Sequence, residues 1–267
     1  MEIIRISDNS VPIVSTSSKG DQSKWFIGNK WVKQNTRGYE GQAEVLASIV
    51  LEHSTLQEKE YIKYYPCKIL LPDKENTIGC YSYDFRGTLQ EVTLERLFEA
   101  NFTSTDFILN NDALSTEEKF EQIMQRVEEF TGLDVRFEIA RLLAIDALIL
   151  NEDRHTNNIL FLYNPINDSW QLAPIFDNGL SLLSDEKDYS PGKPLSILKR
   201  KVKAKPFSSS FSKQLALYKG PAFIDKKALI QTLESSTFDF GRAKQVLLTQ
   251  LNEPIFQRLF TKGSEII

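Results

Sequence analysis

The chain is 267 residues long with a formal net charge of −4 at pH 7, which excludes the general basic surface of many nucleic-acid-binding proteins. Hydrophobic residues make up 41% and charged residues 25%, so the composition is that of a globular protein with one large domain or two lobes. The two cysteines, Cys67 and Cys80, are too few for a disulfide scaffold, and we expect both to be reduced.

The N-terminal residues MEIIRISDNS lack the apolar core of a signal peptide. No apolar run is long enough to cross a bilayer, because the longest candidate contains Arg141 and Asp146. We therefore expect a cytoplasmic protein that binds no membrane and has no direct contact with nucleic acids. The basic run KRKVKAK at 199–205 is interpreted as a solvated loop.

The first 90 residues are mostly strand patterns. A short β-rich run at 2–6 is followed by two aromatic-rich runs within 23–35, around Gly28-Asn29, a pair suited to a two-residue hairpin turn. Helical spacing of apolar residues follows over 39–53. Two more strands are expected at 61–71 and 76–85.

From about residue 89 the pattern becomes helical, and Ser115 with Glu118 forms a capping box. A hairpin is expected at 159–176, followed by a polar segment over 180–213. The segments with a helical apolar period are 88–101, 115–132, 134–150, 225–236 and 240–260. The expected class is α+β, with a β-rich lobe over 1–86 and a mostly helical lobe over 87–267.

Three polar residues match the parts that phosphoryl transfer needs. Asp153 and Asn158 are five residues apart after an apolar helix, and Asp177 lies two residues before Gly179. A carboxylate must orient the attacking hydroxyl and accept its proton, while an amide oxygen and a second carboxylate hold Mg²⁺. Asp153 is the candidate base, and Asn158 and Asp177 are the candidate metal ligands. The spacings match a protein-kinase catalytic loop and DFG motif, although Asn157 stays an alternative to Asn158.

Two further residues of this loop have weaker interpretations. His155 is expected to anchor the loop rather than to carry a proton, and is included among the candidate catalytic residues. Arg154 is either an exposed base or a cation that binds a phosphoserine in the 180–213 segment. A solvated turn remains the alternative interpretation for the loop as a whole.

The N-terminal half offers the lysine and glutamate that a kinase uses to hold the α- and β-phosphates. Lys33 is the candidate lysine, with Lys30 as its competitor. Glu40 and Glu44 lie on one helix face, and we favour Glu44 because it lies deeper in the helix.

A loop over the nucleotide phosphates is expected at 15–25, where small residues let backbone N–H groups face anionic oxygens. An ordinary surface loop is the alternative interpretation. The hinge is expected near 82–87. The candidate nucleotide-binding residues are Ser17, Ser18, Lys19, Gly20, Lys33, Tyr83 and Phe85.

These motifs resemble the HipA-like kinase family, in particular its short forms that lack an extra N-terminal subdomain. The resemblance rests on Asp153-x-His155-x-x-Asn158, the APIFDNG run, Lys33 in KWVKQN, the serine-rich loop before it and YEGQAEVLAS. The order of elements matches over nearly the whole chain. The chain departs from a protein kinase in its D-R-H order, which also resembles phosphoinositide kinases, and in Asn178, which replaces the DFG phenylalanine.

The resemblance implies a two-lobed kinase fold and serine/threonine phosphorylation of a protein with ATP and Mg²⁺. It also implies a possible toxin of a toxin–antitoxin pair, with a small helix-turn-helix antitoxin as partner. Autophosphorylation in the phosphate loop is expected at Ser15, Ser17 or Ser18. The alternatives are a lipid kinase of the phosphoinositide type and a non-catalytic nucleotide-binding scaffold.

Overall fold

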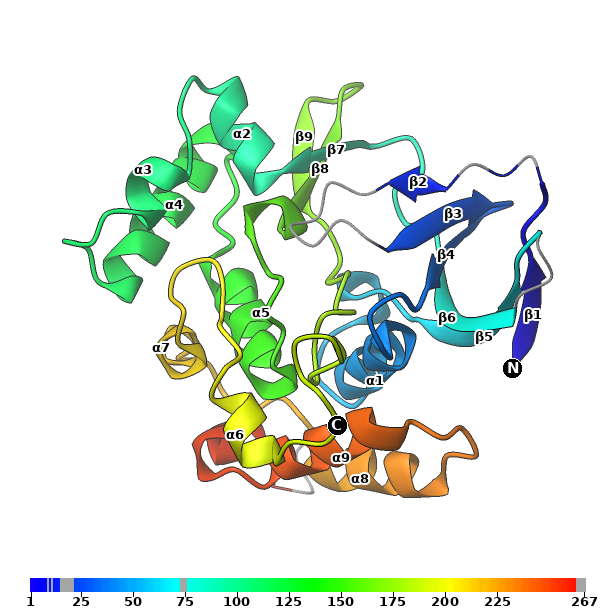
Figure 1. Ribbon diagram of the computed structural model, residues 1–267. Helices are drawn as coiled ribbons and strands as arrows, with labels where there is room; N and C mark the ends of the chain where they lie inside the picture. Colours follow the sequence, from blue (N-terminus) through cyan, green and yellow to red (C-terminus); the bar gives the residue numbers. More distant parts are fainter. Residues whose placement is uncertain (9, 11, 15–21, 73–75, 263–267) are drawn as a thin grey trace. The chain divides into compact units, whose positions relative to one another are not determined.

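The computed structural model describes residues 1–8, 10, 12–14, 22–72 and 76–262 (Figure 1). The predicted phosphate-loop residues Ser15, Ser17, Ser18, Lys19 and Gly20 lie outside these ranges. The described residues form two compact units. The first unit lies within 1–85, 176–202 and 221–267, and the second within 86–175 and 203–220. The first break falls next to the predicted hinge, but two later segments group with the N-terminal residues instead of with the predicted helical lobe.

The first unit contains a sheet whose described strands have the order β1-β5-β6-β4-β3-β2. Strand β1 runs parallel to β5, and the other neighbours are antiparallel. The bounds are β1 (Glu2–Arg5), β2 (Ile13–Val14), β3 (Ser23–Ile27), β4 (Lys30–Gln34), β5 (Tyr65–Leu70) and β6 (Asn76–Tyr83). The predicted hairpin turn is present, because Ile27 pairs with Lys30 across Gly28-Asn29. Gly28 has a φ of 65°, a left-handed value that glycine adopts without a steric penalty.

The two faces of this sheet have different surroundings. One face carries an apolar cluster that includes Trp25, Val32 and Tyr81. Against the other face lies α1 (Glu40–Glu52), one residue shorter at each end than predicted (Figure 1). Gly41 permits the close approach, because a Cβ there would lie 2.8 Å from the backbone carbon of Gly79 in β6. The helix is therefore buried on more than its predicted apolar face.

The rest of the first unit is helical, with α9 (Gly241–Leu251) in contact with α1. The other helices described in this unit are η1 (Glu58–Glu60), α6 (Leu195–Lys199), α8 (Lys226–Ser235) and η3 (Pro254–Leu259). The single helix expected over 240–260 is thus two pieces. The break comes at Pro254, which has no N–H to continue the α-helical ladder and begins a 3₁₀ helix instead.

The second unit packs helices beside a sheet with the described strand order β7-β8-β9. Its strands are β7 (Gln90–Thr93), β8 (Leu160–Asn164) and β9 (Ser169–Leu172), and its helices are α2 (Leu94–Ala100), α3 (Asp106–Leu109), α4 (Thr116–Thr131), α5 (Arg136–Ile149), η2 (Thr156–Asn158) and α7 (Phe211–Leu215). The helix expected over 88–101 was wrong in its first part. Residues Gln90–Thr93 pair with β8, a long-range interaction that overrides their local periodicity.

The ends of α4 and α5 follow from their sequences. Ser115 Oγ accepts a hydrogen bond from Glu118 N at 3.2 Å, and Ser115 N donates to Glu118 Oε2 at 2.7 Å, which completes the predicted capping box. Helix α5 is buried along most of its length and ends at Leu150, which has a left-handed φ of 55°. This residue turns the chain into the polar loop 151–158. Among the described helices, none combines the length and apolarity that a membrane span requires.

Both cysteines are free and buried. Cys67 pairs with Gly79, the residue before Cys80, so the two side chains point to opposite faces of the sheet. Burial raises the pKa of Cys67 to about 12 and raises the pKa of Cys80 well above its ordinary value. Neither thiol therefore forms an appreciable amount of thiolate at neutral pH.

The burial of both cysteines predicts that their thiols react slowly with disulfide reagents in the folded protein. At mildly alkaline pH we expect neither thiol to react with Ellman's reagent on the timescale of free cysteine, because the thiolate is the reactive form. Both should react at once in guanidinium chloride. Fast labelling of one thiol before unfolding would contradict the burial of that strand.

Candidate functional site

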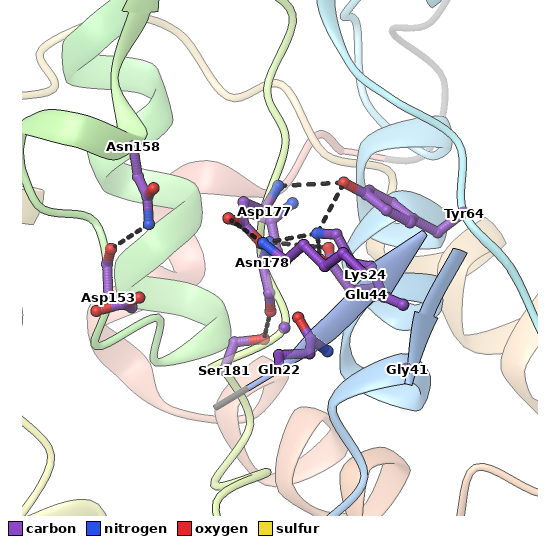
Figure 2. A network of polar contacts seen from close by, with 12 residues as sticks. Gln22, Lys24, Gly41, Glu44, Tyr64, Asp153, Asn158, Asp177, Asn178 and Ser181 are labelled. Carbon is purple, nitrogen blue, oxygen red and sulfur yellow. Dashed lines mark hydrogen bonds and ion pairs between the residues drawn. The ribbon is translucent and has the colours of Figure 1, made fainter. Parts of the chain in front are cut away.

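A buried ionic cluster in the first unit brings together three of the predicted residues, Lys33, Glu44 and Asp177. Lys33 Nζ, on β4, donates to Glu44 Oε1 and to Asp177 Oδ1, the latter at 2.7 Å. Asp177 Oδ2 lies 3.4 Å from Lys24 Nζ, on β3. Two lysines thus face two carboxylates, and the charges balance in a place where an unpaired charge would be costly. Figure 2 shows Lys24, Glu44 and Tyr64 around Asp177.

The pKa values of this cluster reflect burial and charge pairing. Burial alone would lower the pKa of Lys33, but the carboxylates of Asp177 and Glu44 outweigh it and raise that pKa well above its ordinary value. Burial raises the pKa of Tyr64, with Glu44 adding to the effect. Lys33 is therefore a permanent cation, and Tyr64 keeps its phenol proton while its oxygen accepts from Lys33 Nζ and Asp177 N, each at 3.3 Å.

The turn that carries Asp177 is held by side chains on both sides. Asp177 has a φ of 56°, which is costly for a residue with a side chain and persists only where neighbours fix it. Asn178 N donates to Glu44 Oε2 at 2.8 Å, so the same glutamate orients both Lys33 and this turn. Ser181 Oγ donates to Asn178 O at 2.6 Å, and Ser184 Oγ donates to Gly179 O at 2.6 Å.

The segment after Asp177 also docks on the start of α1. Tyr39 OH lies 2.8 Å from the carbonyl oxygens of both Leu182 and Leu183, and Arg37 Nε donates to Asp185 Oδ2 at 2.5 Å. Backbone bonds join the same two segments, from Tyr39 N to Ser184 O and from Glu186 N to Arg37 O. Helix α1 and the Asp177 turn therefore form one connected structure.

Glu40 has a different role from Glu44. Its carboxylate accepts hydrogen bonds from the backbone N–H groups of Thr36, Arg37 and Gly38 at 3.3, 2.6 and 3.1 Å. These bonds anchor the residues that lead into α1. Of the two glutamates weighed in the sequence, Glu44 is the partner of Lys33.

Lys30 and the two hinge candidates lie elsewhere in the first unit. Lys30 pairs with Glu2 at 2.6 Å and lies over the ring of Tyr81, 4.5 Å from its centroid. Tyr83 shares that face, opposite the face of Lys33, because side chains alternate along a strand. Its contact with a nucleotide stays a prediction. Phe85 packs against Phe176, the residue before Asp177, with ring centroids 5.8 Å apart.

In the second unit, residues 151–158 form a tight polar loop around Asp153. Asp153 N donates to Asn151 Oδ1 at 3.0 Å, and Asn158 Nδ2 donates to the Asp153 carbonyl at 2.8 Å (Figure 2). Asn158 is buried and its amide oxygen is the group suited to a hard cation. Asn157, the alternative candidate, is exposed and accepts a hydrogen bond from Thr93 Oγ1 at 3.0 Å.

His155 and Arg154 both support this loop. His155 Nδ1 accepts a hydrogen bond from Asn157 N at 3.2 Å, and its Nε2 lies 3.8 Å from Asp153 Oδ2. Arg154 is neither exposed nor available to a phosphoserine, so both earlier interpretations were wrong. Its guanidinium is buried and donates to both oxygens of Asp146 on α5, at 2.9 and 3.1 Å, and to Asn158 O at 3.0 Å. The pattern could not reveal this, because the pairing depends on how the loop folds back on α5.

Three residues of the site were missed in the sequence. Tyr64 has no local signal, because it lies in an ordinary strand pattern. Lys24 could have been found, since the two-residue turn at Gly28-Asn29 places it opposite Lys33. Lys205, from the run interpreted as a solvated loop, has its Nζ 3.5 Å from Asp153 Oδ1. Nothing local indicates that long-range contact.

The donors present suit one class of metal. Within the described ranges, no three His, Cys, Asp or Glu residues gather into a cluster that could hold a metal ion. A carboxylate at Asp177 and an amide oxygen at Asn158 are hard ligands, and Mg²⁺ commonly takes one or two protein oxygens and completes its shell with phosphate and water. Each of these two side chains is of the kind that such an ion takes, and neither is a soft or imidazole ligand of the kind that favours a transition metal.

Comparisons with known proteins place the fold. Neither protein-family models nor curated protein sequences gave a match. Among solved structures, the crystal structure of the Helicobacter pylori proinflammatory kinase CtkA superposes with a TM-score of 0.59 at 16% sequence identity, over 89% of this chain and 87% of that one. The chain has a kinase-like fold. The predicted α+β class and two-lobed kinase-like architecture are thus confirmed.

The buried pair of Asp146 and Arg154 predicts a large stability difference. Asp146→Ala leaves the Arg154 guanidinium buried with its charge uncompensated, so we expect the free energy of unfolding to fall by about 3–5 kcal/mol. Urea denaturation of the wild type and the variant measures this difference in the free energy of unfolding.

The matched control is Arg136→Ala, which removes partly exposed ion pairs from the other end of α5. Such surface pairs contribute little, so a change of about 1 kcal/mol or less is expected. If both variants lost the same free energy of unfolding, the buried Asp146 pair would contribute no more to stability than a surface ion pair.

Proposed function

We propose that the protein is a Mg·ATP-dependent kinase that phosphorylates serine or threonine in another protein. The observation that carries the proposal is the position of Lys33, whose ammonium is held between Glu44 and Asp177 on a kinase-like fold. In kinases, a lysine held by a helix glutamate binds the α- and β-phosphates, and the Asp of the DFG motif binds Mg²⁺. Here a strand lysine, a helix glutamate and the Asp of the DNG run are likewise in contact, with the lysine between the two acids.

The first unit would bind the nucleotide phosphates. Lys33 neutralises phosphate oxygens, and Glu44 fixes its direction through a hydrogen bond that also fixes the Asn178 backbone. Asp177 is the proposed Mg²⁺ ligand of this unit, and Asn158 is the ligand proposed in the second unit; the ion, when bound, would offset negative charge on the phosphate oxygens. The contact between Lys33 and Asp177 keeps the carboxylate oriented when no cation is bound. This preorganisation lowers the cost of assembling the site.

The second unit would supply the base. Asp153 accepts the proton of the acceptor hydroxyl while that oxygen bonds to the γ-phosphorus, and the bond from this phosphorus to the β,γ-bridging oxygen breaks to release ADP. The carboxylate is largely buried, and its backbone is fixed at Asn151 and Asn158. The buried pair of Arg154 and Asp146 anchors the loop to α5.

The choice of acceptor rests on the motif resemblance. Asp153-x-His155-x-x-Asn158 with the DNG run supports membership of the HipA-like group, and that group supports a protein serine or threonine as acceptor. A role as toxin with a small helix-turn-helix antitoxin follows from the same resemblance. Autophosphorylation of Ser15, Ser17 or Ser18 is part of the proposal.

The first test replaces the base. Asp153→Asn keeps the shape but cannot accept the proton, so phosphate transfer from [γ-³²P]ATP to protein should fall by about 10²–10⁴-fold. Glu152→Gln, the adjacent acid, is the control and should retain activity. Undiminished transfer in Asp153→Asn would reject the role of Asp153.

The same assay separates the alternatives through its acceptors. Parallel reactions contain casein, phosphoinositide vesicles or the protein alone. Labelled lipid without labelled protein would indicate a lipid kinase. ATP binding without transfer in any reaction would indicate a scaffold and overturn the proposed activity.

The second test concerns the metal. Asp177→Asn removes a charged ligand, so the Mg²⁺ concentration for half-maximal activity should rise by at least about tenfold. Asp188→Asn, an exposed acid of the same segment, should leave it unchanged. An unchanged Mg²⁺ requirement in Asp177→Asn would show that Asp177 is not a ligand.

A further inference from the structure

Lys205 lies close to Asp153, although 52 residues separate them in the chain. Its Nζ is 3.5 Å from Asp153 Oδ1, and both residues belong to the second unit. The two side chains differ in exposure, at 39% for Lys205 and 7% for Asp153. An accessible ammonium therefore faces a carboxylate that is almost fully buried.

Buried contacts hold the backbone of the turn that carries Lys205. The side chain of Gln214, on α7, is fully buried and spans the turn: its Nε2 donates to Lys205 O at 2.8 Å and its Oε1 accepts from Phe207 N at 3.0 Å. Phe207 is buried with its ring 5.2 Å from that of Phe120. Helix α7 packs on α5, and the end of α5 leads into the Asp153 loop. Both partners are therefore positioned by the same helix, as a precise site requires.

A purely structural role explains little of this arrangement. A partly exposed ion pair adds little to stability because water screens it. The Asp153 loop is already fixed by Asn151, Asn158 and Arg154. What remains is a cation held beside the atom that would take the acceptor's proton.

We propose that Lys205 is a catalytic residue that binds the γ-phosphoryl group during its transfer to the hydroxyl activated by Asp153. The inference rests on the proposed function. As the hydroxyl oxygen bonds to phosphorus, its proton passes to Asp153, and the bond to the ADP oxygen breaks. Lys205 stays protonated throughout. Because Asp153 loses its negative charge in this step, the ammonium is drawn toward the phosphoryl oxygens, where it stabilises the transition state.

Neighbouring lysines of the run provide matched controls. Lys203 is exposed and lies only two residues from Lys205. Lys199 pairs with Glu253 at 2.5 Å, within the first unit. The run therefore contains lysines of the same type with different surroundings, and the proposal concerns Lys205 alone.

The experiment compares wild type, Lys205→Ala, Lys205→Arg and Lys203→Ala in steady-state phosphate transfer with varied ATP. Lys205→Ala should lower kcat by about 10²–10³-fold, the effect of removing one transition-state donor, with KM for ATP little changed. Lys205→Arg should recover part of kcat because it restores the cation. Lys203→Ala should behave as wild type, and thermal unfolding midpoints should agree across all four proteins.

The outcomes separate this inference from the proposed function. Wild-type kcat in Lys205→Ala would overturn the role of Lys205 and leave the kinase activity standing. A loss of kcat that comes with a lower unfolding midpoint and no recovery by arginine would assign Lys205 a structural role and also overturn the proposal. If wild type transfers no phosphate to any acceptor, the proposed function fails, and the role of Lys205 fails with it.

Discussion

The hydrogen bonds that Glu44 makes to Lys33 and to Asn178 N are the contacts on which the first unit depends. A buried carboxylate is unfavourable unless its oxygens are satisfied, and here one oxygen binds a strand lysine while the other binds the backbone beside Asp177. Strand β4, helix α1 and the Asp177 turn therefore belong together. Removing any one of them would leave a charge or a polar group buried without its partner.

The second unit uses the same physical solution with other residues. The guanidinium of Arg154 is buried and is satisfied by Asp146 and by the Asn158 carbonyl. Helix α5, which is buried along most of its length, thus carries Asp146 near its C-terminal end, where the following loop is held. Asp153 and Asn158, which the proposed reaction uses, are also buried, and Arg154 donates to the carbonyl of Asn158. Precise positioning requires that the reactive side chains be attached to backbone that is held rigidly.

Several features of the site could be predicted from sequence because they are set by short spacings. The hairpin turn at Gly28-Asn29, the limits of α1 and the capping box of α4 depend on neighbours within a few residues. The Asp153 and Asn158 spacing likewise places both residues in one loop. Periodicity failed at Gln90–Thr93, where pairing with β8 decides the structure.

The sequence by itself determined the kinds of groups available: a strand lysine, helix acids, a loop with Asp and Asn, and a DNG turn. Local geometry fixes such elements, since a turn or a cap forms between near neighbours. Only the tertiary structure decided the partners: Glu44 rather than Glu40 for Lys33, Asp146 for Arg154, and Lys205 beside Asp153. These contacts join residues that are far apart in the chain. The contacts of Glu44 with Lys33 and of Asp146 with Arg154 form because buried charges must be compensated, a condition that applies only once the chain has folded.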